Sequence, residues 1–240
     1  MIPWEKIDTA RVPDSDGELR LMRRGQEFSI MLGANELMNS RLSGSEAALA
    51  TLAAKQIGKV AGPQVLIGGL GMGFTLRAAL AVFGSKAQIV VAELVPAVVA
   101  WASGPLAGIF GDSLSDPRVD VQEVDVAQVI QSHPRAFDAI LLDVDNGPEG
   151  LTRKANDALY DAAGLQAAHT ALRPGGVLAV WSSGSNAGFS KRLRQAGYAV
   201  NEVAVRAVGK GVGARHVIWI ATAEATPPSP PRDARARRSR

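Results

Sequence analysis

The residues best suited to chemistry are a set of glycines and the acids that follow them. Gly69, Gly71 and Gly73 lie between an apolar segment and a stretch with helical spacing. A turn of this kind brings backbone N–H groups close to a nucleotide, because glycine tolerates φ angles that a Cβ forbids. Glu93 lies 20 residues beyond Gly73, where a carboxylate accepts hydrogen bonds from ribose hydroxyls. Asp125 follows the next apolar segment and is placed either to accept from an adenine amino group or to cap a helix.

Two further acids follow a fourth apolar segment. Asp143 and Asp145 are separated by one residue, and neighbouring carboxylates attract an ammonium group and can accept its proton. The two side chains share a face only where the backbone is extended. Asn146 and Gly147 also form a turn signal, so a structural turn is the alternative interpretation. We expect Asp143 and Asp145 to be the catalytic acids.

Apolar segments alternate with helical segments over most of the chain, which predicts a parallel sheet with helices on both faces. A final pair of apolar segments, 199–206 and 216–221, leaves no room for a helix and predicts an antiparallel hairpin. Five strand–helix units closed by a hairpin are typical of the Rossmann-like, class I methyltransferase α/β fold, with a seven-stranded, mostly parallel sheet. The predicted strands span 64–67, 88–92, 119–123, 138–142 and 176–181, and the helices span 74–83, 96–110, 126–131, 156–172 and 187–196.

The chain is expected to have three parts. Residues 1–60 would hold an irregular start to residue 18, a β-hairpin (19–23 and 27–32), and a helix over 46–57 capped by Ser45. Residues 61–223 would form the nucleotide-binding domain. Residues 224–240 would form a disordered tail, because a segment rich in proline and arginine cannot bury enough apolar surface to order.

Composition narrows the classes of function. The chain has no cysteine, and its three histidines are scattered, so neither a thiolate nucleophile nor a protein-built metal site is expected. The net charge of +3 belongs to the tail, where five arginines face two acids, and the rest of the chain is neutral. A specific nucleic-acid surface is therefore not expected. No apolar segment reaches the length of a membrane span, and we expect a soluble, cytoplasmic protein.

Several of these segments resemble the polyamine aminopropyltransferases, the spermidine synthases. The similarity covers about residues 60–185 and includes the glycine turn with the Thr-Leu-Arg that follows it. It also includes Glu93, Asp125, and the acidic loop that begins at Asp143. The remaining similar motifs are Asp116-Pro117-Arg118-Val119, Phe137-Asp138-Ala139-Ile140 and Leu172-Arg173-Pro174-Gly175-Gly176.

The resemblance implies a fold, a ligand and a set of roles. The turn from Gly69 to Gly73 would hold decarboxylated S-adenosylmethionine or a relative, with Glu93 on the ribose and Asp125 on the adenine. Asp143 would orient and deprotonate a small amine that accepts an aminopropyl group, and the protein would form a homodimer. Of the family's Tyr-His-Glu segment the chain keeps at most the glutamate, Glu46.

Two alternatives stay open. Met72 stands where the family's glycine motif has aspartate, which favours a methyltransferase that uses S-adenosylmethionine itself. The changed acceptor segment would also suit a non-catalytic nucleotide-binding homologue.

Overall fold

A large, mostly parallel sheet organises the computed structural model, which describes residues 2–13, 16–144, 147–148, 154–208 and 212–224. Its seven strands lie in the order β10-β11-β9-β8-β5-β6-β7, and β11 runs antiparallel to both of its neighbours. The α/β fold predicted from the sequence is therefore confirmed. The strands are β5 (Gln64–Gly68), β6 (Gln88–Glu93), β7 (Val119–Glu123), β8 (Phe137–Leu142), β9 (Leu172–Ser182), β10 (Tyr198–Val208) and β11 (Val212–Ala223).

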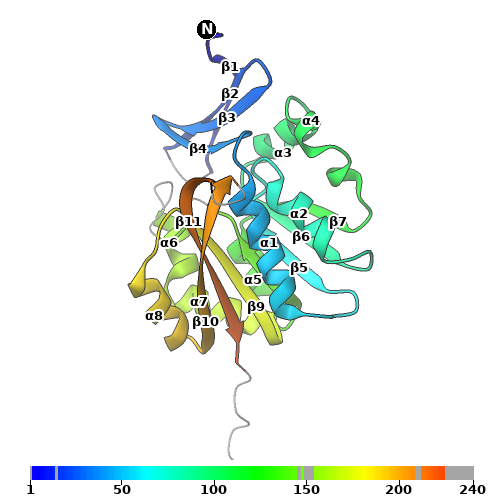
Figure 1. Cartoon of the computed structure of the whole chain (residues 1–240), viewed down its shortest axis with the longest axis vertical. Helices are drawn as coiled ribbons and strands as arrows, with labels where there is room; N and C mark the ends of the chain where they lie inside the picture. Colours follow the sequence, from blue (N-terminus) through cyan, green and yellow to red (C-terminus); the bar gives the residue numbers. More distant parts are fainter. Residues whose placement is uncertain (1, 14–15, 145–146, 149–153, 209–211, 225–240) are drawn as a thin grey trace, which may run out of the picture.

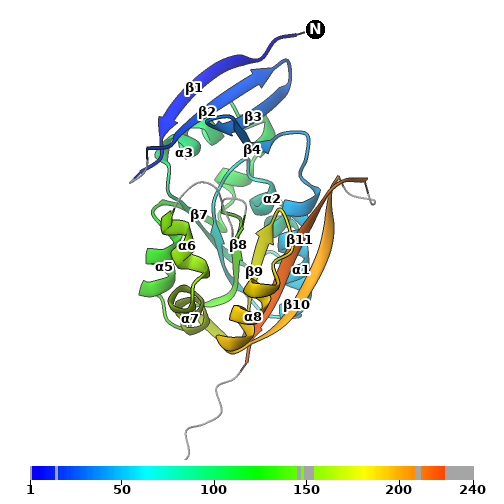
Figure 2. The same ribbon diagram turned by 90° about the vertical axis from the view of Figure 1, so that its left-hand side faces the viewer.

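Helices cover both faces of this sheet (Figures 1 and 2). One apolar core joins the sheet to α1, α2 and α3, and a second joins its other face to α5, α7 and α8. Because both faces are covered, all six residues of the central strand β8 are buried. The helices are α1 (Gly44–Ile57), α2 (Phe74–Val82), α3 (Pro96–Ser103), α4 (Ala107–Phe110), α5 (Val126–Ser132), α6 (Lys154–Tyr160), α7 (Ala162–Ala171) and α8 (Ala187–Gln195), with a 3-10 turn at Ser113–Ser115.

A second, antiparallel sheet lies over one end of the large sheet (Figure 2). It contains β1 (Glu5–Arg11), β2 (Glu18–Arg24), β3 (Glu27–Leu32) and β4 (Asn35–Asn39). The predicted hairpin is β2–β3, but the prediction of an irregular segment before residue 18 was wrong. Charged and polar residues dominate β1, which lies at the edge of the sheet and is mostly exposed, so its sequence lacks the apolar signal of a strand.

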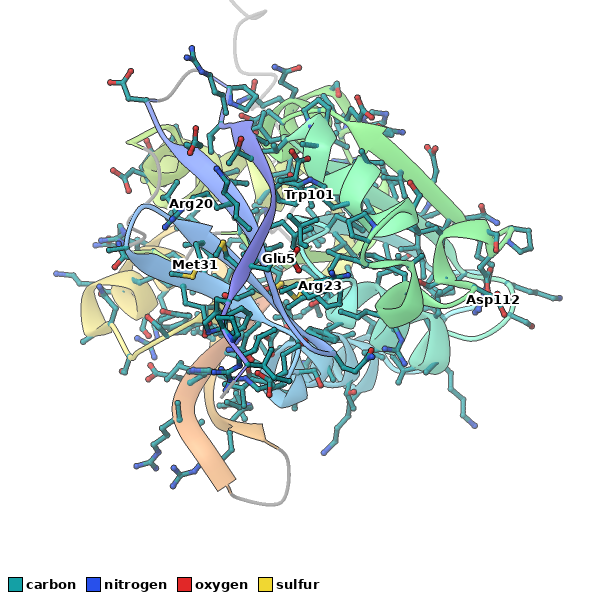
Figure 3. The ribbon with its side chains drawn as sticks, turned by 90° about the horizontal axis from the view of Figure 1, so that it is seen from above. Glu5, Arg20, Arg23, Met31, Trp101 and Asp112 are labelled. Atoms are coloured by element: carbon teal, nitrogen blue, oxygen red, sulfur yellow. The ribbon has the colours of Figure 1, made fainter. Side chains whose placement is uncertain are left out.

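The N-terminal sheet is fastened to the body through α3. The indole nitrogen of Trp101 donates a 2.7 Å hydrogen bond to a carboxylate oxygen of Asp8, and Figure 3 shows Trp101 beside the N-terminal strands. On the outer edge, Arg23 of β2 pairs with Glu5 of β1 at 3.0 Å. The Trp101–Asp8 bond thus ties the sheet to the body, whereas the Arg23–Glu5 pair joins two strands within the sheet.

Two helices predicted as continuous are interrupted. The segment 96–110 divides at Gly104 and Pro105, because proline has no N–H to continue a helix and restricts the residue before it. The segment 156–172 divides at Asp161, whose side chain accepts from the N–H of Gly164 and caps a new helix, α7. Leu172 then begins β9 rather than ending a helix.

Candidate active site

The site lies where β5 and β8 end side by side at the centre of the large sheet. The strand order reverses around this pair, and ligands of open α/β sheets bind at such a point. The N–H of Asp143 donates to the carbonyl of Gly68 at 3.0 Å, which holds the two loops together. Gly69 has φ +91°, and a Cβ there would lie 2.6 Å from the carbonyl oxygen of Asp143. Only glycine therefore permits this approach.

The three glycines of the turn have different surroundings. Gly69 and Gly71 line a cavity, whereas Gly73 packs against the ring of Phe110, which a Cβ would meet at 2.4 Å. Gly73 thus serves the contact between α2 and α4. The side chain of Met72 is fully buried in the core and does not line the cavity.

A methionine from the N-terminal sheet lies against the turn. The sulfur of Met38 accepts a 3.0 Å hydrogen bond from the N–H of Met72, and Met38 also lines the cavity. The N-terminal sheet is thereby in direct contact with the segment expected to bind the nucleotide.

Glu93 ties the turn to the end of β6. One of its oxygens accepts from the N–H of Leu70 and the other from the N–H of Val95, both at 2.9 Å. Burial raises the pKa of the Glu93 carboxyl, and the backbone N–H groups around it oppose that rise. The N–H groups of Leu70, Gly71, Leu94 and Val95 all act on this carboxylate, so a ligand hydroxyl would meet an acceptor that is already oriented by the backbone. Glu93 lines the cavity, as a ribose-binding residue must.

Asp125 has both features expected of it. It is the N-cap of α5 and accepts a 2.9 Å hydrogen bond from the N–H of Ala127. It also lines the cavity next to Val126. The capping role and a ligand-binding role are therefore compatible.

Asp143 is a buried carboxyl with an acidic neighbour. The hydroxyl of Thr75 donates to Oδ2 of Asp143 at 2.6 Å. Burial, together with the charge of Glu46, raises the pKa of Asp143 to about 7. Burial also raises the pKa of Glu46, which lies in the first turn of α1. A carboxyl with a pKa near neutrality can both accept and release a proton at physiological pH.

Glu46 belongs to a chain of hydrogen bonds that reaches the C-terminal hairpin. The hydroxyl of Ser45 donates to Oε2 of Glu46 at 2.7 Å, and Nδ1 of His216 lies 2.9 Å from the same hydroxyl. The His216 ring packs edge-on against Trp181 at 4.8 Å. The prediction that Ser45 caps α1 was wrong, because the helix begins two residues earlier, at Gly44, with Ser43 at the N-cap position.

A cavity of about 180 Å³ collects these groups. Four carboxyl side chains line it, from Glu46, Glu93, Asp125 and Asp143, and no lysine, arginine or histidine does so among the residues that the structure describes. The remaining wall is apolar. The N-terminal sheet and the loops within and after it contribute Val12, Leu19, Ile30, Leu37 and Met38, and the large sheet and its loops and helices contribute Ala92, Leu94, Val95, Val98, Val126, Val144 and Trp181.

Asp145, the second predicted catalytic acid, lies outside the described residues, as does Asn146. The pair that the structure brings together is instead Asp143 and Glu46. The sequence reasoning did not place Glu46, Thr75 or His216 in the site. Thr75 had a signal, since it belongs to the Thr-Leu-Arg motif, and Glu46 stands where the similar family has glutamate. His216 had no signal, because it lies about 70 residues from the nearest predicted site residue.

The known proteins to which this chain is similar include an aminopropyltransferase and several spermidine synthases. Polyamine aminopropyltransferase 2 of Pseudomonas aeruginosa is 32% identical over 120 residues, which are 48% of this chain and 32% of that protein. The match thus spans about a third of the curated relative's length. The crystal structure of spermidine synthase from Thermotoga maritima superposes with a TM-score of 0.69 at 16% identity, covering 90% of this chain and 72% of that one. The chain therefore shares its fold with the spermidine synthases.

Two further solved structures share this fold. A spermidine synthase in complex with the transition state analogue AdoDATO gives a TM-score of 0.68 at 16% identity, with the same shares covered. A probable spermidine synthase from Corynebacterium glutamicum gives 0.62 at 13% identity, covering 91% of this chain and 79% of that one. No family model matches the chain.

Two of the motifs that resemble those of the spermidine synthases stabilise the scaffold. Arg118 pairs with Asp116 at 2.7 Å and donates to the carbonyls of Leu80 and Gly84, which fastens the end of α2. Arg173 pairs with Asp138 at 2.7 Å, far from the cavity, at the opposite end of the sheet. The side chains of these two motifs stabilise the fold and do not line the cavity, so the motifs indicate the fold and not the site.

Within the described residues, none of the helices combines the length and the apolar character needed to cross a bilayer. The same part of the chain holds no group of three or more histidine, aspartate or glutamate side chains that could bind a metal ion.

Proposed function

We propose that the chain transfers an aminopropyl group from decarboxylated S-adenosylmethionine to a small amine. The cavity carries this proposal, because four carboxyl groups line it without a basic side chain among its described residues. Such a site attracts a sulfonium ion and amines, and it disfavours a ligand with its own carboxylate. The aminopropyltransferase and spermidine synthase names of its relatives support the same reaction.

The residues fit the nucleotide part of such a donor. Gly69 and Gly71 leave room beside the turn, and Glu93 and Asp125 offer carboxylate oxygens on neighbouring strands. Ala92, Val95 and Val126 give the apolar surface that an adenine ring needs. When bound, the sulfonium compound supplies a carbon activated for displacement, with a neutral thioether as the leaving group.

The protein's own part in the reaction is to position the acceptor and remove a proton. An aliphatic amine has a pKa near 10 in water and attacks only when neutral. Asp143, with a pKa of about 7, is sufficiently ionised at neutral pH to take the proton, and Thr75 orients its carboxylate. The apolar wall excludes water and shields the amine in its neutral form.

One experiment tests the proposal. The protein is incubated with decarboxylated S-adenosylmethionine or with S-adenosylmethionine, together with a panel of small amines, and the thioether product is identified by mass spectrometry. Methylthioadenosine from the decarboxylated donor is the expected product.

Other results would point to the alternatives. S-adenosylhomocysteine as the product would show that the chain is a methyltransferase, which is the alternative favoured by Met72 in place of the family's aspartate. If neither compound raised the melting temperature, the nucleotide site itself would be refuted, because a ligand that binds only the folded state must stabilise it. A cytoplasmic homodimer remains a prediction from the sequence.

A further inference from the structure

The hydrogen-bond chain beside the cavity runs from a buried carboxyl group toward solvent. Ser45 is 1% exposed and Glu46 is 8% exposed, whereas His216 on β11 is only half-buried. The three residues come from two elements far apart in sequence, α1 and the C-terminal hairpin. The proposed reaction requires only Asp143 as proton acceptor, so this chain of polar groups needs another explanation.

The direction of the hydrogen bonds can be worked out from the number of protons. A serine hydroxyl has one proton. When Glu46 is ionised, Ser45 donates that proton to Oε2, and the contact between Ser45 and Nδ1 of His216 is then donated by the imidazole. Glu46 is therefore the acceptor at the end of two hydrogen bonds that point the same way, and this arrangement favours its ionised form.

The ionised form of Asp143 is stabilised less than that of Glu46. Asp143 is half-buried and accepts from the hydroxyl of Thr75, and the charge of Glu46 acts on it. Two neighbouring carboxyl groups that repel each other cannot both ionise readily. Each accepts from one hydroxyl, but the hydroxyl of Ser45 is itself backed by the imidazole of His216, so Asp143 is the acid that holds the proton. The structure thus distinguishes the two acids by their donors.

We propose that His216, acting through the hydroxyl of Ser45, fixes Glu46 as the ionised member of the carboxyl pair and leaves the exchangeable proton on Asp143. His216 and Ser45 are then positioning residues for the proton transfer. This inference rests on the proposed function for its use in catalysis, but the assignment of the proton can be tested without turnover.

Among the described residues, the side chains that face His216 from neighbouring elements carry no charge. The groups that face His216 are Ser45 on α1, the Trp181 ring on β9 and Val205 on the neighbouring strand β10. The adjacent charged residues of the hairpin, Arg206 and Arg215, are exposed. Burial lowers the pKa of His216, so at neutral pH it acts as a neutral hydrogen-bond donor rather than as a cation.

The test follows the carboxyl groups by NMR. Protein with ¹³C-labelled aspartate and glutamate side chains is titrated, and the two signals are assigned with Glu46→Gln and Asp143→Asn. In the unsubstituted protein Glu46 should ionise at lower pH than Asp143. In Ser45→Ala the midpoint of Glu46 should rise and that of Asp143 should fall, each by about one pH unit, because the donor to Glu46 is lost.

His216 provides a matched pair of variants. His216→Leu should shift both midpoints in the same opposed directions as Ser45→Ala, but less, because Ser45 keeps its hydroxyl. His216→Asn should retain the midpoints of the unsubstituted protein, since the asparagine amide can donate from the position of Nδ1.

The proposal requires that the titration midpoints of Glu46 and Asp143 move in opposite directions. Simple loosening of the site would let water in and lower both midpoints together, and that result, or midpoints that do not move, would overturn the proposal. It would also be overturned if His216→Asn behaved like His216→Leu. If the titrations came out as expected but no thioether formed with any amine, the proposed function would fail while the proton assignment stood.

Discussion

Asp143 is the proposed proton acceptor, and its surroundings predict a dependence of the rate on pH. The carboxyl must be ionised to accept a proton, and its pKa is raised to about 7 by burial and by Glu46. The rate should therefore fall as the pH drops through 7. A plot of kcat/KM against pH should show an acid limb near this value, and a limb near pH 4 would contradict the role given to the buried carboxyl.

Replacement of the same residue separates binding from turnover. Asp143→Asn keeps the shape of the side chain but removes its ability to accept a proton. We expect kcat to fall by a factor of about 10²–10⁴, with little change in the affinity for the donor measured by calorimetry. An equal loss of affinity would show that Asp143 holds the nucleotide instead.

Glu93 should give the opposite result. Glu93→Ala leaves the N–H groups of Leu70 and Val95 without their acceptor, so the free energy of unfolding should fall by about 1–3 kcal/mol. Donor binding should weaken as well, because the glycine turn loses its anchor. Glu123, its exposed partner on β7, is the control. Glu123→Ala should leave both urea denaturation and calorimetric affinity unchanged.

The sequence predicted individual site residues to different degrees. Gly69, Glu93, Asp125 and Asp143 were found because each follows a strand, and the ends of parallel strands meet at one edge of a sheet. Whether they bind a ligand stays a prediction. His216 could not be found in this way, since its place beside Ser45 depends on how the hairpin folds back on α1.

Among the elements, the turn between β5 and α2 carries the tightest backbone constraint. Gly69→Ala would place a Cβ 2.6 Å from the carbonyl oxygen of Asp143, in addition to the strain of its positive φ. Gly84→Ala has a comparable φ, +79°, with no atom within 4 Å of the new Cβ. It should therefore cost only about 1 kcal/mol in chemical denaturation.

The difference between the two glycine variants isolates the contact between the turn and the acidic loop. Gly69→Ala should be clearly less stable than Gly84→Ala and should lose turnover, because Asp143 must move. Equal stability in the two variants would show that φ strain alone makes glycine necessary at position 69.

The boundaries of the strands and helices show where local sequence signals are sufficient to predict an element. The central strands β5 and β8 were recognised because buried parallel strands are continuous apolar segments. The strand β1 was missed because exposed edge strands are polar, and helix α1 was given the wrong cap because Ser43 and Ser45 are equally good cap residues in sequence. In both cases tertiary contacts decided the outcome.

For the whole molecule, the buried carboxyl pair predicts that stability and pH are linked. The pKa of Asp143 is higher in the folded state than in the unfolded chain, where it is near 4. The folded state therefore binds this proton more tightly, and the free energy of unfolding should decline as the pH rises from about 4 to 7. Asp143→Asn should flatten this decline and stabilise the protein at pH 7.

Urea denaturation at pH 5 and pH 7.5 checks this prediction. Asp116→Asn is the control, since pairing with Arg118 lowers the pKa of Asp116 to about 2, outside this interval. Its variant should keep the slope of the unsubstituted protein. A decline of the same steepness in Asp143→Asn would show that the buried carboxyl is not responsible for it.

The composition of the cavity wall has a consequence for how such a protein can diversify. All four carboxyl groups come from α1 and from the strands and loops of the large sheet, whereas the N-terminal sheet and the loops within and after it supply only apolar side chains. One wall of the pocket is thus encoded in a stretch of the gene that carries none of its acids. Substitution at Val12, Leu19 or Ile30 can reshape that wall while the four carboxyl groups stay in place, so related proteins can differ in pocket shape and keep the same charge.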